Sequence, residues 1–291
     1  MRRVFLATLL CCLLALGGSA LATKHDPVLL VAFGTSETSA LTAYSAVAAS
    51  FTKNGMAPVW AYTSDIIRRK MAKAGTHLFS IDEGMDALTQ KGVKKLRVQS
   101  LHIVAGEEFS QMERSVLMHL ERKPGQFEEV LIGRPLLESS RDLEDVVNAV
   151  LAEFPKERTA TDAILLMGHG NHSGRGDLVL DAARAAFHKR DPLVYLVTVE
   201  GSGNVDAVLA DLKKNGIKRV WLQPFMLVAG DHAKNDLAGA EPDSFASRLK
   251  NAGMEVVPHL KGLGELAGVR AVFLRHAAET QDNIVTIKEA N

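Results

Sequence analysis

The chain of 291 residues is poor in the residue types on which several protein classes depend. Its only cysteines are Cys11 and Cys12, aromatic residues make up 5% of the composition, and the formal net charge is zero. The balanced charge and the lack of a basic block argue against nucleic-acid binding. The low aromatic content also argues against a surface on which bases stack.

The first 22 residues are typical of a secretory signal peptide. Arg2 and Arg3 precede an apolar run, and "ALA" at 20–22 predicts cleavage after about Ala22. The apolar run is shorter than a membrane span, so we expect no stable membrane anchor after cleavage, with a retained anchor as the alternative. "RRVFL" also resembles the twin-arginine signal, which leaves the export route open. We therefore expect a periplasmic protein.

Both cysteines lie inside this signal segment, so the mature protein would contain none. Disulfides and thiolate chemistry are then excluded, and stability has to come from core burial. With 47% apolar residues, the chain is long enough for one large domain or two ordinary ones. A metal site would have to be built from His, Asp and Glu.

Short apolar runs alternate with amphipathic stretches from residue 27 onward. This alternation predicts an α/β fold of two similar, doubly wound halves with parallel sheets. The runs that we interpret as strands are 28–34, 59–64, 93–106, 128–137, 162–170, 192–200 and 217–230.

The two halves also resemble each other in their letters. "VQSLHIVAGEEF" (98–109) shares Gln and then VAG plus an acid with "LQPFMLVAGDHA" (222–233), and "LLVAFGTS" (29–36) matches "ILLMGHGN" (164–171). This similarity indicates an ancient duplication. In folds of this kind ligands bind outside the carboxyl ends of the strands, so two facing halves predict a cleft between them.

We accordingly divide the chain into three parts. These are the signal peptide (1–22), an N-terminal α/β half (23–158) and a C-terminal α/β half that carries the predicted site (159–291).

Three strand ends of the second half carry metal-binding side chains: His169 in "MGHG", Glu200 in "VTVEG" and His232 in "VAGDH". They follow each other at intervals of about one strand–helix–strand unit, which brings the strand ends side by side. Two imidazoles and a carboxylate suit Co²⁺, Ni²⁺, Fe²⁺ or Zn²⁺. Three protein ligands also leave coordination positions open, as in working rather than structural sites.

Simpler interpretations exist for each of these residues. A single histidine at a strand end is usually a polar residue at the rim of the sheet, and Glu200 could cap the helix that follows. The glycine-rich "GHGNHSGRG" (168–176) lacks the lysine and spacing of a P-loop. The chain contains no G-x-S-x-G motif, which argues against an α/β-hydrolase.

After the signal peptide, the chain resembles the anaerobic-type sirohydrochlorin cobaltochelatases of the CbiK kind, which are class II tetrapyrrole chelatases. The motifs that carry the resemblance are "FGTS" (33–36), "YTSDIIRRK" (62–70), "QSLHI" (99–103), "LIGRPLL" (131–137), "MGHG" (167–170), "MLVAGDHAKND" (226–236) and "GLGE" (262–265).

The resemblance implies that His169, Glu200 and His232 hold the metal, the same three residues that the topology indicates. It further implies insertion of Co²⁺, or alternatively Fe²⁺ or Ni²⁺, into sirohydrochlorin or a related tetrapyrrole. Metal insertion removes pyrrole N–H protons, and we expect His169 and Glu200 to accept them, since neutral imidazole is a suitable base near pH 7. No organic cofactor is required.

Further residues are expected to support this chemistry. Because sirohydrochlorin is rich in carboxylates, Arg68, Arg175 and Lys234 are candidate cationic contacts. His102, which the repeat places at a strand end, is a candidate for lining the pocket or for packing.

Residues around the third metal ligand are expected to orient it. Asp231 and Asp236 are candidates for hydrogen bonds to His232, as metal-bound imidazoles usually require. His119 is predicted on a helix, at the surface or in an interface between subunits of a homo-oligomer.

The expected export leaves a second hypothesis open, because cobalamin and sirohaem are assembled in the cytoplasm. The chain could be a periplasmic carrier of haem or metal derived from a chelatase, with His102 or His119 as an axial haem ligand. A zinc hydrolase that uses the same three ligands is a third hypothesis.

Overall fold

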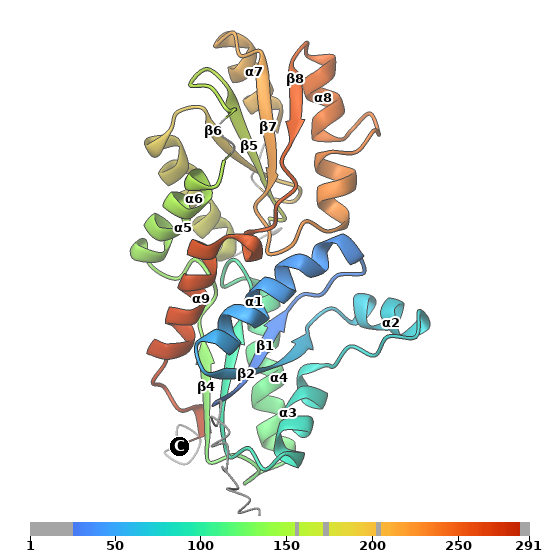
Figure 1. Ribbon diagram of the computed structural model, residues 1–291, viewed down its shortest axis with the longest axis vertical. Helices are drawn as coiled ribbons and strands as arrows, with labels where there is room; N and C mark the ends of the chain where they lie inside the picture. The colour runs from blue at the N-terminus through green and yellow to red at the C-terminus, as the bar shows by residue number, and fades with distance from the viewer. Residues whose placement is uncertain (1–25, 155–156, 171–174, 202–204, 286–291) are drawn as a thin grey trace, which may run out of the picture.

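A computed structural model describes residues 26–154, 157–170, 175–201 and 205–285 of the chain. Two α/β units are stacked along the long axis of the molecule (Figure 1). The predicted signal peptide lies outside the described residues. Within them, no helix combines the length and apolar character that crossing a membrane requires.

The N-terminal unit is built on a four-stranded sheet in the order β2-β1-β3-β4, with all neighbouring strands parallel. The inner strand β1 is buried on both faces over most of its length, as its continuous apolar run predicts. The elements are β1 (Asp26–Ala32), the 3-10 turn η1 (Thr38–Ala40), α1 (Leu41–Lys53), β2 (Met56–Tyr62), α2 (Asp65–Lys73), α3 (Ile81–Gln90), β3 (Lys95–Ser100), α4 (Glu107–Arg122), β4 (Glu129–Gly133) and α5 (Ser140–Ala152).

The C-terminal unit repeats this arrangement with a second parallel sheet in the order β6-β5-β7-β8. The predicted α/β class with two similar halves and parallel sheets is therefore confirmed. The elements are β5 (Ala163–Gly168), α6 (Arg175–Arg190), β6 (Val194–Thr198), α7 (Val205–Lys214), β7 (Arg219–Pro224), the π-helical turn η2 (Ala233–Leu237), α8 (Phe245–Asn251), β8 (Glu255–Pro258), the 3-10 turn η3 (Leu263–Glu265) and α9 (Ala267–Glu279).

Several details differ from the sequence prediction. The strands predicted over 128–137 and 217–230 extend only over Glu129–Gly133 and Arg219–Pro224. Strand β8 was not predicted, because it is a half-exposed edge strand of four residues that carries no continuous apolar run. The apolar stretch 93–106 forms a strand only over Lys95–Ser100. Beyond Ser100 the backbone N–H of Leu101 still bonds to the carbonyl of Val31, after which the chain leaves the sheet.

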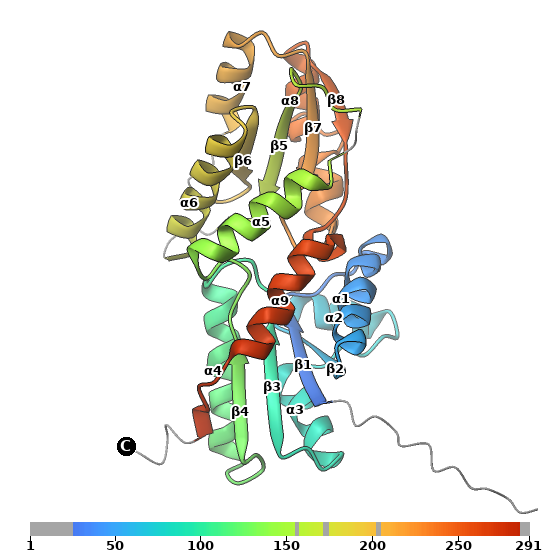
Figure 2. The same cartoon turned by 60° about the vertical axis from the view of Figure 1, so that its left-hand side comes forward.

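The last helix returns to the first unit. Helix α9 packs beside α5 and against strands β3 and β4 (Figure 2). Arg97 of β3 donates a hydrogen bond to the carbonyl of Ala277, and Leu131 of β4 forms an antiparallel bridge with Asn283. The C-terminal segment thus belongs spatially to the N-terminal sheet, although the division at 158/159 assigns it to the other half.

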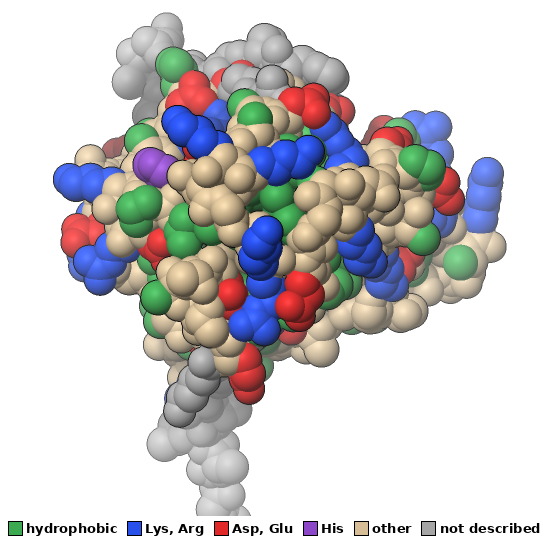
Figure 3. Space-filling model, turned by 90° about the horizontal axis from the view of Figure 1, so that it is seen from above, with side chains coloured by type: hydrophobic (Ala, Val, Ile, Leu, Met, Phe, Trp, Pro, Cys, Tyr) green, Lys and Arg blue, Asp and Glu red, His purple; other side chains and the backbone are tan. Residues whose placement is uncertain are grey.

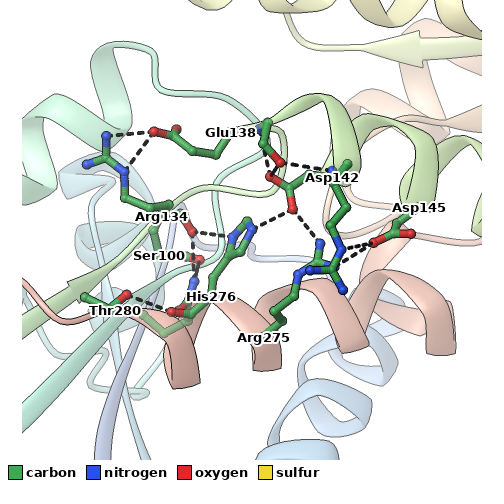
Figure 4. A network of polar contacts seen from close by, with 11 residues as sticks. Ser100, Arg134, Glu138, Asp142, Asp145, Arg275, His276 and Thr280 are labelled. Atoms are coloured by element: carbon green, nitrogen blue, oxygen red, sulfur yellow. Dashed lines mark hydrogen bonds and ion pairs between the residues drawn. The ribbon is translucent and has the colours of Figure 1, made fainter.

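A polar network fastens α9 to α5 (Figure 4). The buried Asp142 forms a capping box with Ser139 at the start of α5 and also accepts hydrogen bonds from His276 and Arg275 of α9. Burial raises the pKa of the Asp142 carboxyl, but the hydrogen bonds from Ser139, His276 and Arg275 lower it by more. The net shift of the pKa is therefore downward.

One apolar cluster runs through both units. Val28 and Leu30 of β1 belong to the same cluster as Ile164 and Leu166 of β5, and Phe273 of α9 joins them. Each of these side chains is fully buried, and burial of such a side chain contributes about 1.5–3 kcal/mol. The two halves therefore share a core, which holds their facing edges together.

Candidate metal site at the strand ends

His169 follows strand β5 and lies between two glycines. Gly170 has a φ of +86°, and a Cβ atom at this residue would lie 2.0 Å from the carbonyl oxygen of Glu200. The backbone N–H of Glu200 in turn donates to the carbonyl of His169 at 2.8 Å. Only glycine permits so close an approach of the two strand ends. This backbone contact places the His169 and Glu200 side chains next to each other.

The three predicted ligands converge in the structure. Nδ1 of His169 lies 3.9 Å from Oε2 of Glu200, and the ring centroid of His169 lies 5.0 Å from that of His232 at an interplanar angle of 80°. All three side chains are partly exposed to solvent. An incoming ion can therefore reach them.

A π-helical turn sets the orientation of His232. His232 precedes η2, and its Nδ1 forms a hydrogen bond with the carboxylate of Asp236 inside that turn. This contact leaves Nε2 as the nitrogen available to a metal ion. Asp231, the other predicted orienting residue, is exposed to solvent. The structure therefore connects Asp236 to the site.

The convergence stops short of a closed coordination sphere. In the described ranges, no group of three His, Cys, Asp or Glu side chains is arranged ready to hold a metal ion. Typical Zn–N and Zn–O bonds are about 2.0–2.2 Å, so the carboxylate and the rings would have to turn towards an ion. The assignment of His169, Glu200 and His232 as ligands stays a prediction.

The strand ends of the two units meet at this site. Thr35, which follows β1, lies so close to Gly230 that a Cβ atom there would be 3.3 Å from its hydroxyl oxygen. Two residues further along the chain from Thr35, Glu37 pairs with Lys234. The hydrogen bond and charge of Lys234 lower the pKa of the Glu37 carboxyl. The loop after β1 thus lies against the loop that carries His232.

The predicted substrate-binding residues occupy different settings. Lys234 is engaged with Glu37 at the junction, and Arg68 pairs with Asp65 on α2. The side chain of Arg175 lies outside the described residues. His102 is nearly buried, with Nδ1 at 2.9 Å from the hydroxyl of Ser100 and with Nε2 buried and without a partner. Burial lowers the pKa of His102 to about 4, so this imidazole is neutral at pH 7.

The prediction that His119 lies at the surface or in an interface was wrong. His119 is a residue of α4, and its ring is fully buried. Nδ1 lies 2.6 Å from Asp82 and Nε2 lies 3.0 Å from Gln126. A helical pattern cannot distinguish an exposed histidine from one that turns inward and pairs with a carboxylate of another helix. With both nitrogens engaged, His119 is in no position to ligate haem in this structure.

The far end of the C-terminal unit is a weaker candidate site. Figure 3 shows Lys and Arg side chains intermixed there with acidic and hydrophobic ones. A cavity of about 600 Å³ opens near the amino ends of β6 and β7. Four of its polar side chains pair with each other: Tyr195 donates to Asp211 at 2.6 Å, and Arg219 donates to Asp162 at 2.9 Å.

Comparisons with known proteins agree with the sequence motifs. The family model "Cobalt chelatase (CbiK)" matches residues 26–282. The chain is 35% identical over 217 residues to sirohydrochlorin cobaltochelatase CbiKC of Nitratidesulfovibrio vulgaris, covering 75% of this chain and 76% of that protein. It is 34% identical over 219 residues to the sirohydrochlorin cobaltochelatase of Salmonella typhimurium, covering 74% and 80% of the two chains.

Solved structures share the fold at low sequence identity. SirB from Bacillus subtilis with Fe³⁺ aligns with a TM-score of 0.62 and 15% identity, over 88% of this chain and 95% of that one. CbiX, described as the terminal enzyme of sirohaem biosynthesis in denitrifying bacteria, aligns with a TM-score of 0.51 and 14% identity, over 88% and 100% of the two chains.

Proposed function

The chain belongs to the cobalt chelatase (CbiK) family, and on this premise we propose that it inserts a divalent metal into sirohydrochlorin or a related tetrapyrrole. Co²⁺ is the proposed metal substrate and Fe²⁺ the alternative. The curated relatives are named for sirohydrochlorin and cobalt, which supports this choice. Iron stays in the test because SirB, which shares the fold, was solved with Fe³⁺.

The observation that carries the proposal is the convergence of His169, Glu200 and His232 from three strand ends. Two imidazoles and one carboxylate form a donor set that binds Co²⁺ and Fe²⁺ yet leaves positions open for the pyrrole nitrogens. His169 and Glu200 lie 3.9 Å apart, so either group can take a pyrrole proton while the other stays on the metal. His232, held by Asp236, completes the set.

The carboxylates of the tetrapyrrole require cationic partners, for which Arg68, Arg175 and Lys234 remain the candidates. Lys234 and Arg68 already form ion pairs with Glu37 and Asp65. Exposed ion pairs of this kind contribute little to stability, because water and salt screen them, so a substrate carboxylate can replace Glu37 or Asp65 at little cost.

We further propose that the protein acts after export to the periplasm. The support is the sequence at 1–22, with its charged start, apolar run and small-x-small site. Expression of the full chain followed by cell fractionation tests this proposal. A processed protein in the periplasm is the expected result, whereas an unprocessed protein in the cytoplasm would refute it.

A metallation assay tests the proposed activity. Purified protein is mixed with sirohydrochlorin and with Co²⁺, Fe²⁺ or Ni²⁺, and metal insertion is followed by absorbance against the spontaneous reaction. We expect acceleration by the protein, loss of the acceleration in His169→Ala and His232→Ala, and no loss in His188→Ala. His188 is a matched control because it is exposed near the end of α6.

The same assay separates the enzyme from a carrier. A carrier of haem or metal would bind its ligand without accelerating metallation, and this outcome would contradict the proposed function. Ester hydrolysis by the zinc-loaded protein that disappears in His169→Ala would instead favour a hydrolase.

A further inference from the structure

The register of the two sheets shows which residues of one half correspond to which residues of the other. Gln99 of β3 lies opposite Leu30 of β1, and Gln223 of β7 lies opposite Leu166 of β5. Since Gln99 and Gln223 correspond in the repeated sequence, Leu30 and Leu166 are equivalent positions. This register shifts the letter match of 29–36 with 164–171 by one residue.

Phe33 is therefore the counterpart of His169. Each residue follows its equivalent leucine at the same interval and precedes a glycine of positive φ, which is Gly34 in the first half and Gly170 in the second. The first half thus carries an aromatic ring where the second half carries a metal-binding imidazole.

The other two positions differ as well. Through the pairing of β1 with β2 and of β5 with β6, Ser64 corresponds to Glu200. Its hydroxyl caps α2 by accepting from the N–H of Ile67. In the repeated sequence, Glu108 is the counterpart of His232. The carboxylate of Glu108 accepts a hydrogen bond from Thr63 at 2.7 Å. Of the three counterparts, only Glu108 carries a group that readily binds metals.

Phe33 lies in the chain just before a loop that contacts the segment carrying His232. The chain just after Phe33 is the loop in which Thr35 lies against Gly230 and Glu37 pairs with Lys234. Strand β1 ends at the junction of the two units (Figure 1). Phe33 is 46% exposed there.

Other exposed apolar side chains follow the strand ends along the chain. Of the eight large exposed apolar residues in the part of the chain that the structure describes, five follow the carboxyl ends of β1, β2, β5 or β6: Phe33, Leu41, Ile66, Leu178 and Val199. Ligands of folds of this kind bind beyond the strand ends, so exposed apolar side chains in these segments are placed to contact a ligand. These exposed apolar side chains suit a planar ligand that has apolar faces and a charged rim.

We infer that Phe33 forms the apolar support for the tetrapyrrole, against the macrocycle face opposite the metal ligands. The inference rests on the proposed function and adds a division of labour: the C-terminal half holds the metal, and the N-terminal half holds the macrocycle. An aromatic ring contributes contact area on a flat π-system and offers no metal ligand. The residue equivalent to the metal-binding His169 thereby contacts the tetrapyrrole, which is the second substrate.

Kinetics with the two substrates varied separately test this role. Initial rates of Co²⁺ insertion are measured for Phe33→Ala, with sirohydrochlorin and Co²⁺ each titrated at saturation of the other. We expect the KM for sirohydrochlorin to rise about tenfold, because the contact of one large apolar side chain is lost. The KM for Co²⁺ should not change, and Phe33→Tyr, which keeps the ring, should restore the KM for sirohydrochlorin.

The matched control is Leu117→Ala on α4, which removes a side chain of similar exposure, 41%, away from the strand ends. Equal KM values for sirohydrochlorin in Phe33→Ala and Leu117→Ala would overturn the inference. So would a rise in the KM for Co²⁺ alone.

A binding titration without metal separates this inference from the proposed function. Sirohydrochlorin binding is followed by its fluorescence. If the unaltered protein binds sirohydrochlorin and Phe33→Ala weakens that binding, the inference holds even where no metallation occurs. If the unaltered protein metallates sirohydrochlorin and Phe33→Ala binds it equally well, the inference fails while the proposed function stands.

Discussion

The contact between His232 and Asp236 leads to the sharpest prediction about metal binding. Nδ1 of His232 bonds to the Asp236 carboxylate within the π-helical turn η2. A carboxylate at Nδ1 favours the N–H on that nitrogen and directs the lone pair of Nε2 outwards. We expect Asp236→Ala to release the ring and weaken metal binding without removing a ligand.

The size of the effect follows from the role of such contacts. Loss of a residue that orients a metal ligand typically lowers affinity about 10- to 100-fold, which corresponds to about 1.4–2.8 kcal/mol. Loss of a ligand itself, as in His232→Ala, should cost more. Both Asp236 and His232 are partly exposed, so neither substitution should disrupt the core.

Calorimetric titration of the purified protein with Co²⁺ measures the affinity directly. Asp231→Ala is the matched control, since Asp231 adjoins His232 in the sequence but is exposed to solvent. We expect Asp231→Ala to bind Co²⁺ as the unaltered protein does. Equal affinities of Asp236→Ala and Asp231→Ala would refute the orienting role of Asp236.

Three further predictions concern stability and local geometry. Asp142→Ala should lower the free energy of unfolding, measured in urea, by about 3 kcal/mol, because part of a helix capping box and the partner of the buried His276 are lost together. The control is Asp145→Ala, which should cost less than about 1 kcal/mol, because the Asp145 side chain is 42% exposed against 4% for Asp142. An equal loss in the two variants would contradict this account. The hydrogen bonds of Asp162 outweigh its burial and lower its pKa from 3.8 to about 2. The carboxylate therefore contributes about 2 kcal/mol to the free energy of unfolding above pH 4, and this contribution is lost as the pH falls towards 2. When the free energy of unfolding is measured against pH, Asp162→Asn should show a smaller decrease between pH 4 and pH 2 than the unaltered protein. Gly170→Ala should cost at least about 2 kcal/mol in thermal unfolding and weaken Co²⁺ binding, since the residue has positive φ and its Cβ would meet the Glu200 backbone; normal Co²⁺ affinity in a folded variant would refute the close approach.

The repeated sequence indicated a duplication, but its letters alone assigned the wrong partner to His169. Matching "LLVAFGTS" to "ILLMGHGN" pairs Gly34 with His169, whereas the strand register pairs Phe33 with it. Register depends on hydrogen bonds between strands that are distant in the chain, and a one-residue slip leaves an apolar run looking equally good.

Histidine burial was the other property that the sequence left open. His119 and His102 have similar apolar neighbours in the chain, yet His119 has two hydrogen-bond partners and His102 has a buried nitrogen without one. The partners of His119 include Asp82, which comes from a different helix. A one-dimensional pattern shows which side chains are polar, but it does not show which of them meet.

The sequence by itself determined the α/β class, the two similar halves and the spacing that brings His169, Glu200 and His232 to neighbouring strand ends, because hydrophobic period and strand–helix alternation are local properties. Only the tertiary structure decided the return of α9 to the first sheet, the pairing of Glu37 with Lys234 across the junction and the exposure of Phe33 there. These features depend on contacts between segments far apart in the chain. Their energies come from packing and hydrogen bonds that form only when these segments meet in the folded chain.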